Sequence, residues 1–157
     1  MSQENVEIVR RVDDAFLAGL ERGDFAGGAA TGLVSEDHEL IVVAEFPGQR
    51  RYRGTEEVVE FVQRWTEDFE RFSLHRQELI DAGNGRVFTS HKAIRHRQGK
   101  WGADRGGVLS VWELEAGLVV RILHYLDRDE ALGAAGLSGV KALRRTGPGV
   151  GASGVPI

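Results

Sequence analysis

Residues 108–127 read VLSVWELEAGLVVRILHYLD, two runs rich in β-branched and aromatic residues joined by Ala116-Gly117. A short glycine-containing link between two runs of this kind is typical of a tight hairpin turn. A third run, at residues 87–97, precedes them across a glycine-rich connection at residues 99–107. Together the three runs predict a consecutive antiparallel meander.

Two further strands are predicted upstream of the meander. Residues 74–82 lie before Asn84-Gly85, and both central residues of a type I′ turn need positive φ, which favours this dipeptide. Residues 40–43, Leu-Ile-Val-Val, form a short β-branched run. These two strands and the meander supply enough apolar surface for a sheet that packs against helices.

Helical periodicity occurs at residues 3–20, more weakly at 24–33, and again at 55–72. The last of these has an apolar stripe at three- and four-residue spacing, made of Val58, Val62, Trp65, Phe69 and Phe72. A short helix is predicted at residues 129–135, and it stops at Gly136. The order helix, helix, strand, helix and then four strands predicts an α+β fold. A strongly bent antiparallel sheet wrapped around the long helix at residues 55–72 would leave a cavity at its open end.

The composition limits the classes of function. The chain has 157 residues, no cysteine and a formal net charge of −4, so disulfides, thiolate metal sites and bulk attraction to nucleic acid or anionic membranes are not expected. We predict one domain at residues 3–137 and a flexible, glycine-rich tail at residues 138–157. The polar N-terminus and the lack of a long apolar run lead us to expect a cytoplasmic protein.

No cofactor or metal is predicted. Residues 149–154 match the GxGxxG pattern of nucleotide-binding loops, but no strand precedes them and only three residues follow. No helix could therefore form there to hold a pyrophosphate.

Several segments resemble the SnoaL-like branch of the NTF2-like superfamily, which includes polyketide-cyclase and ketosteroid-isomerase-like proteins. In chain order they are ENVEIVRR and AF, GDF, FPG, YRG, LIDAGNGRV, VWELEAGLVVRI and YLDRDEALGAAGL, and they span residues 3–137. The resemblance implies a cone-shaped, cystatin-like α+β barrel that is often a homodimer. The family holds cyclases, isomerases, dehydratases and epoxide hydrolases beside non-catalytic binders, so the fold does not fix the reaction.

The resemblance also implies which residues face the pocket, a choice that strand periodicity alone leaves open for residues 87–97. The inward-facing set it implies is His91, Ala93, Arg95, Ser110, Trp112, Ile122, His124 and Leu126, with Phe16 and Trp65 closing the pocket from the helices. The catalytic set of the steroid isomerases is absent. Phe16, Phe46 and Ser110 occupy the positions of its tyrosine, its general-base aspartate and its acidic hydrogen-bond donor. We therefore expect no steroid isomerase chemistry.

His91, His124 and Asp13 are the candidate catalytic residues. Imidazoles near neutral pKa can pass protons in both directions, and two of them in one apolar cavity would suit proton abstraction or dehydration. The set loosely resembles that of the two-histidine dehydratases. Alternatively, either histidine is a hydrogen-bonded wall residue or faces a dimer partner. Asp13 would need a partner such as His124 or Arg95 if buried, or it is exposed on a rotated helix.

Other candidates are predicted to contact a substrate. Arg95 could bind a carboxylate in bidentate fashion, or it is an exposed residue at a strand end. Glu45 could act as a shifted general base beside Phe46, or it is solvated. Phe16, Trp65, Phe69 and Trp112 are more often core than ligand-stacking residues, although these roles overlap in a cone-shaped fold.

Three functions remain open from the sequence. The first is acid–base catalysis, such as cyclisation, isomerisation or dehydration, on a hydrophobic or polycyclic molecule. The second is non-catalytic binding of such a molecule, and the third is a dimerisation module with a filled core. A homodimer is expected because the outer sheet face is apolar and needs covering, at Phe88, Ile94, Leu109, Val111 and Leu123.

Overall fold

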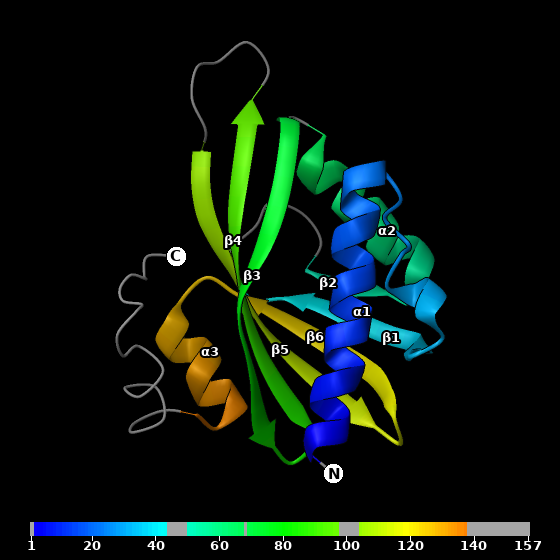
Figure 1. Ribbon diagram of the computed structural model, residues 1–157, viewed down its shortest axis with the longest axis vertical. Coiled ribbons are helices and arrows are strands. Elements are labelled where there is room, and N and C mark those ends of the chain that lie inside the picture. Colours follow the sequence, from blue (N-terminus) through cyan, green and yellow to red (C-terminus); the bar gives the residue numbers. More distant parts are fainter. Residues whose placement is uncertain (1, 44–49, 68, 98–103, 138–157) are drawn as a thin grey trace.

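The computed structural model describes residues 2–43, 50–67, 69–97 and 104–137. Its elements are α1 (Ser2–Arg22), η1 (Ala29–Thr31), β1 (Val34–Val42), β2 (Arg51–Arg53), α2 (Gly54–Thr66), β3 (Phe69–Gly83), β4 (Arg86–Arg97), β5 (Asp104–Glu115), β6 (Leu118–Tyr125) and α3 (Arg128–Ala135). The six strands form one sheet in the order β2-β1-β6-β5-β4-β3. Figure 1 shows this sheet curled, with α1 and α2 on one side and α3 on the other. The predicted α+β class is confirmed. The predicted tail at residues 138–157 lies outside the described residues.

The meander forms as predicted, because its turns are encoded locally. Strands β3 to β6 pair antiparallel in chain order. Asn84 and Gly85 have φ of 53° and 76°, and Ala116 and Gly117 have φ of 52° and 82°, so all four residues adopt the left-handed conformation of a tight hairpin turn. The start of β5 differs from the prediction, because this strand begins at Asp104, within the predicted glycine-rich connection.

The sheet is mixed, which corrects the prediction of a wholly antiparallel sheet. Strand β1 pairs antiparallel with the short β2 but parallel with β6, with Leu40 opposite Ile122 and Val42 opposite His124. Local periodicity predicts that a segment is extended, but it carries no information on a partner far away in the sequence. The parallel pair was therefore missed, and so was β2.

Two predicted helices are shorter than expected. The helix predicted at residues 55–72 ends at Thr66, and Phe69 and Phe72 belong to β3, where pairing with β4 overrides their helical spacing. The helix predicted at residues 24–33 is only the turn η1. A Cβ atom on Gly27 would lie 2.5 Å from the Ala15 carbonyl oxygen, so this segment packs against α1 more closely than a side chain would allow.

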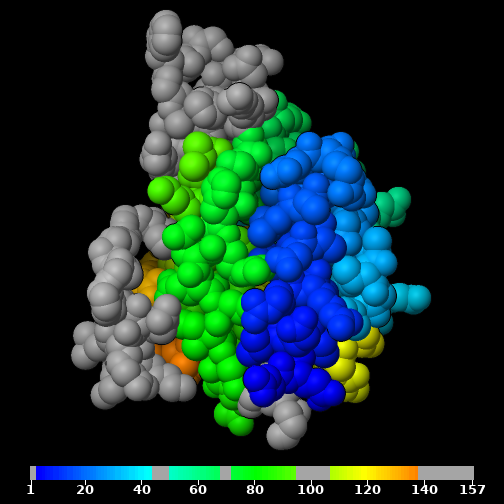
Figure 2. All heavy atoms as spheres, in the orientation of Figure 1, coloured from blue at the N-terminus to red at the C-terminus, as the bar shows by residue number. Residues whose placement is uncertain are grey.

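The long helix on the sheet is α1, with 21 residues, whereas the sequence pointed to the segment that contains α2. In Figure 2, α1 lies along β3 over much of its length. Helix α2 packs instead against β1 and β2. Both helices cover the concave face, and the space between them and the sheet is the site described below.

A β-bulge in β3 controls which side chains reach that space. Arg76 is opposite His91 and Glu78 is opposite Ser90, so Gln77 is the extra residue on its strand. Residues before the bulge and residues after it therefore alternate with opposite phase. As a result Arg76 lies on the concave face, toward α1, while Glu78 lies on the outer face and binds Arg128 of α3.

Helix α3 covers much of the outer sheet face. Phe88, Leu109 and Val111 are 0%, 3% and 1% exposed and pack with Leu132 and Ala135. The sequence argument for a homodimer assumed that these three residues lacked a cover, and that assumption is wrong. No helix in the described ranges is both long and apolar enough to cross a membrane.

Candidate functional site

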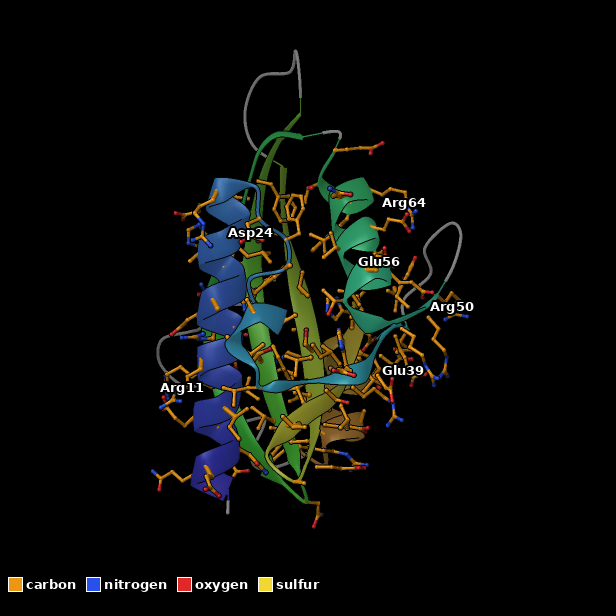
Figure 3. All side chains as sticks on the ribbon, turned by 90° about the vertical axis from the view of Figure 1, so that its right-hand side faces the viewer. Arg11, Asp24, Glu39, Arg50, Glu56 and Arg64 are labelled. Carbon is orange, nitrogen blue, oxygen red and sulfur yellow. The ribbon has the colours of Figure 1, made fainter. Side chains whose placement is uncertain are left out.

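A cavity of about 110 Å³ lies between α1, α2 and the concave side of the sheet. Much of its wall is aromatic or aliphatic, including Phe16, Phe25, Leu40, Val58, Phe61, Val62, Trp65, Leu74, Val108, Trp112 and Ile122. Phe61 and Trp65 stack with ring centroids 6.0 Å apart. In Figure 3, Arg11 of α1 and Arg64 of α2 lie on the outside of the molecule, away from the space between the helices. The helices thus turn apolar side chains inward around a space that the protein leaves unfilled.

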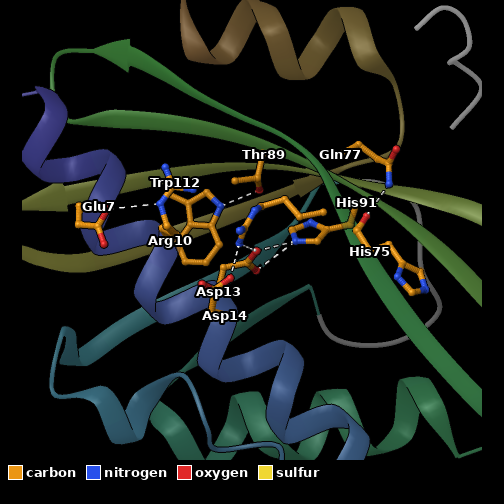
Figure 4. A network of polar contacts seen from close by, with 10 residues as sticks. Glu7, Arg10, Asp13, Asp14, His75, Gln77, Thr89, His91 and Trp112 are labelled. Atoms are coloured by element: carbon orange, nitrogen blue, oxygen red, sulfur yellow. Dashed lines mark hydrogen bonds and ion pairs between the residues drawn. The ribbon is translucent and has the colours of Figure 1, made fainter. Parts of the chain in front are cut away.

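Asp13 is the buried carboxylate of this wall, and it binds two partners. Its residue is 2% exposed, which would be costly for a carboxylate without partners. Arg76 Nη1 donates to Asp13 Oδ2 at 2.8 Å, and His91 Nε2 lies 2.9 Å from the same oxygen and 3.1 Å from Oδ1 (Figure 4). Arg76 Nη1 also donates to Asp14 Oδ1 at 2.8 Å. The predicted partners of Asp13 were His124 or Arg95, and its partners here are His91 and Arg76.

The contact with Asp13 fixes the tautomer of His91. An ion-paired carboxylate accepts hydrogen bonds, so Nε2 of His91 carries the proton and donates it. In the neutral ring the lone pair is then on Nδ1. His91 is buried and lines the cavity, so its position suits a proton acceptor that a carboxylate orients.

His124 lies on β6 and lines the same cavity. Burial, and then the neighbouring His91, lower the pKa of His124 to about 4. The ring is therefore neutral at pH 7. A neutral imidazole has one donor and one acceptor nitrogen, so His124 can hydrogen-bond either kind of group on a bound molecule.

Ser110 is a buried hydroxyl facing the cavity. It is 3% exposed, lies opposite His124 in the β5–β6 pair, and makes no side-chain hydrogen bond to any residue in the described part of the chain. Buried polar groups are nearly always hydrogen-bonded, so among the described residues this hydroxyl is placed to bond a molecule in the cavity. The buried indole N–H of Trp112, in contrast, has a partner within the protein, because it donates to Thr89 Oγ1 at 2.9 Å (Figure 4).

The structure brings most of the predicted residues to one wall. His91, Ser110, Trp112, Ile122, His124, Asp13, Phe16 and Trp65 all line the cavity. Leu126 does not, and its predicted place in the pocket is wrong. It is 63% exposed, because β6 ends at Tyr125 and the chain turns so that Asp127 can cap α3. Glu45 and Phe46 lie outside the described residues, and for Phe69 and Arg95 only the backbone positions on β3 and β4 are described.

Two residues of the site were missed from the sequence. His38 is 5% exposed and lines the cavity, with its Nδ1 2.8 Å from the Ser35 carbonyl oxygen. His38 lies two residues before Leu40 and therefore on the same face of the strand. A prediction of β1 that began earlier than residue 40 would have included it. Arg76 lies two residues after Leu74, which lines the cavity, so strand alternation could have placed it on the same face.

A row of charges on the outer face stabilises the fold away from the cavity. Glu39 of β1 accepts hydrogen bonds from Arg51 and Arg53 of β2, at 2.9 and 3.0 Å, and from Arg121 of β6 at 3.3 Å. These contacts, with those of Arg53 and Arg51 the strongest, lower the pKa of Glu39 to about 2. Arg121 also binds Glu113 of β5, so the row links four neighbouring strands.

Comparisons with known proteins support the fold. No family model and no curated protein matches the sequence. Among solved structures, Bal32a from a soil-derived mobile gene cassette is 22% identical, with a TM-score of 0.63 over 79% of this chain and 89% of that chain. An NTF2-like protein from Burkholderia thailandensis is 23% identical, with a TM-score of 0.63 over 86% of this chain and 97% of that chain.

A third structure has a ketosteroid-isomerase-like fold and comes from Catenulispora acidiphila, in complex with trimethylamine. It is 13% identical, with a TM-score of 0.57 over 80% of this chain and 92% of that chain. Structural similarity at these low sequence identities supports the fold alone, so membership of the SnoaL-like branch remains a prediction. The chain has the fold of the NTF2-like proteins.

Proposed function

We propose that the protein binds a small, largely apolar molecule in this cavity and performs acid–base chemistry on it, of the cyclisation, isomerisation or dehydration type. The observation that carries the proposal is an apolar cavity of about 110 Å³ whose wall holds the Asp13–His91 pair, the neutral His124 and Ser110, whose hydroxyl has no partner among the described residues. Titratable groups in a water-poor pocket are the usual means of moving protons on a bound molecule.

Each polar residue has a proposed role. His91 accepts a proton from the substrate at Nδ1, and Asp13 orients the ring and stabilises its protonated form. Arg76 is a positioning residue, because its guanidinium donates a hydrogen bond to Asp13 and holds the carboxylate in place. His124 and Ser110 hydrogen-bond the reacting group of the substrate, so that charge developing on it has a donor nearby.

The cavity size favours a single-ring substrate over the polycyclic one considered from the sequence. A dry protein cavity of roughly 150 Å³ holds one benzene molecule. The space of about 110 Å³ therefore suits one small ring or a short branched chain. A polycyclic molecule would have to displace wall residues such as Phe16 or Trp65.

Proteins of the same fold that were crystallised with small molecules support the binding half of this proposal. The Catenulispora protein forms a complex with trimethylamine, and TerC, 16% identical to this chain with a TM-score of 0.62, was co-crystallised with polyporic acid. These molecules differ from each other in chemistry. They support binding of some small molecule here, without identifying it.

Non-catalytic binding is the second candidate function. The observation that favours it is that both oxygens of Asp13 are engaged by Arg76 and His91, so the carboxylate itself is not free to react. A homodimer also remains a proposal. It would use the outer face that α3 leaves uncovered, and sedimentation at micromolar protein concentration tests it.

The binding half is tested by native mass spectrometry of the purified protein, which we expect to carry a retained small molecule. The catalytic half is tested by incubating that molecule with the protein in D₂O. A base that removes a carbon-bound proton exchanges it with D₂O and returns a deuteron to the carbon, so the mass of the molecule should rise, or its structure should change. His91→Asn should slow this at least 100-fold, whereas His75→Asn, at an exposed histidine on β3, should not. A retained molecule that is neither labelled nor converted would leave binding alone as the function.

A further inference from the structure

The described wall of the cavity carries a carboxylate but no permanently charged cation. Among the described residues that line it, Asp13 is the carboxylate, His38, His91 and His124 are the imidazoles, and no lysine or arginine is present. The guanidinium that binds Asp13, that of Arg76, is shared with Asp14 at the same distance of 2.8 Å. Two carboxylates thus share one cation, so the described side chains at this edge of the cavity carry an excess of negative charge when His91 is neutral.

The hydrogen bonds of His38 and His91 also determine which nitrogen of each ring carries the proton. The Ser35 carbonyl oxygen can only accept, so the 2.8 Å contact requires Nδ1 of His38 to carry the proton. The lone pair of the neutral ring is then on Nε2. His91 donates from Nε2 to Asp13, so its own lone pair is on Nδ1. Two buried rings of the wall are therefore held in the forms that offer a hydrogen-bond acceptor to a ligand.

We infer that the cavity selects uncharged or cationic molecules that carry a hydrogen-bond donor on an apolar body, such as single-ring alcohols and amines, and rejects carboxylates. This rests on the proposed function, since it assumes that the cavity binds a small molecule. An anion entering the cavity would lose its hydration, meet no cation among the described wall residues and lie near Asp13. A hydroxyl or ammonium group would instead donate to the imidazole nitrogens of His38 or His91.

Four probes with the same seven carbons separate these classes: benzyl alcohol, its isomer anisole, benzylamine and benzoate. Benzyl alcohol and anisole have the same atoms, but only the alcohol donates a hydrogen bond. Their dissociation constants would be measured by isothermal titration calorimetry at pH 8, where histidine side chains are mostly neutral. We expect benzyl alcohol and benzylamine to bind at least tenfold more tightly than anisole and benzoate.

The outcomes are distinguishable. Benzoate within threefold of benzyl alcohol, or anisole equal to it, would overturn the inference and leave the proposed binding function intact. Failure of all four probes to bind would overturn the binding function and the inference with it. His38→Leu, which removes one acceptor, should reduce the preference for benzyl alcohol over anisole at least threefold. His75→Leu, at the exposed histidine, should leave the preference unchanged. Should His38→Leu not fold, His38→Phe serves the same comparison.

Discussion

Ser110 carries a buried hydroxyl with no partner among the described residues, and this predicts a conflict between stability and binding. Ser110→Ala should raise the free energy of unfolding by about 1 kcal/mol, because a buried polar group without a hydrogen bond destabilises the folded state. The same change should weaken binding of the retained molecule. Urea denaturation measures the first effect and native mass spectrometry the second.

Ser90→Ala is the matched control. Ser90 is equally buried on β4, but its hydroxyl donates to Glu78 Oε2 at 2.7 Å. Its removal should therefore lower the free energy of unfolding by about 1–2 kcal/mol. If both substitutions destabilise the protein to the same extent, Ser110 has a partner that the described contacts do not include.

At the scale of elements, Arg76 joins β3 to α1 through Asp13. Arg76→Gln should lower the free energy of unfolding by about 2–4 kcal/mol, because it leaves a buried carboxylate without its cation. Arg10→Gln breaks the exposed ion pair with Glu7 and should change the free energy of unfolding by less than about 0.5 kcal/mol. Equal effects in chemical denaturation would show that Asp13 does not depend on Arg76.

Helix α3 gives a second prediction at this scale. Leu132 is 2% exposed within the apolar cluster on the outer sheet face, so Leu132→Ala should cost about 2–4 kcal/mol. Leu126→Ala, at an exposed leucine just before the helix, should cost less than about 0.5 kcal/mol. Thermal denaturation of the two variants compares them, and a small effect of Leu132→Ala would mean that α3 is not needed to cover the sheet.

The elements also show what the sequence could predict. Strands β4 to β6 were predicted within a few residues of their ends, apart from the early start of β5, because Asn84-Gly85 and Ala116-Gly117 define hairpins locally. The placing of His91, Ser110 and His124 on one face came from the family resemblance, and all three line the cavity. Leu126 was misplaced because β6 ends at Tyr125, before the alternation reaches it. Arg76 was missed because no inward face was assigned to the strand predicted at residues 74–82, and the bulge at Gln77 changes the phase of the residues after it.

For the whole molecule, the pKa values predict a loss of stability in two stages as the pH falls. Between the ordinary histidine pKa of about 6.5 and about 4, the unfolded chain binds a proton that His124 in the folded protein does not, so stability falls over this range. Below about 4.5, Glu39 begins to be protonated in the unfolded chain, and its contribution is lost as the pH approaches 2. Stability should therefore be highest above pH 6.5.

Chemical denaturation at several pH values tests the two stages. His124→Gln should flatten the stage between pH 6.5 and 4, and Glu39→Gln should flatten the lower one while reducing stability at neutral pH. His75→Gln, at an exposed histidine, should leave the profile as in the unchanged protein. A profile that His124→Gln does not alter would assign the upper stage to other groups.

The parallel pairing of β1 with β6 has a consequence for how the protein is made. Strand β1 lies early in the chain, yet Leu40 and Val42 are paired with Ile122 and His124. During synthesis β1 has no long partner until nearly all of the described chain has left the ribosome, whereas β3, β4 and β5 can pair as soon as each emerges. The hairpins should therefore assemble first, and the wall that joins His38 to His124 should be completed last.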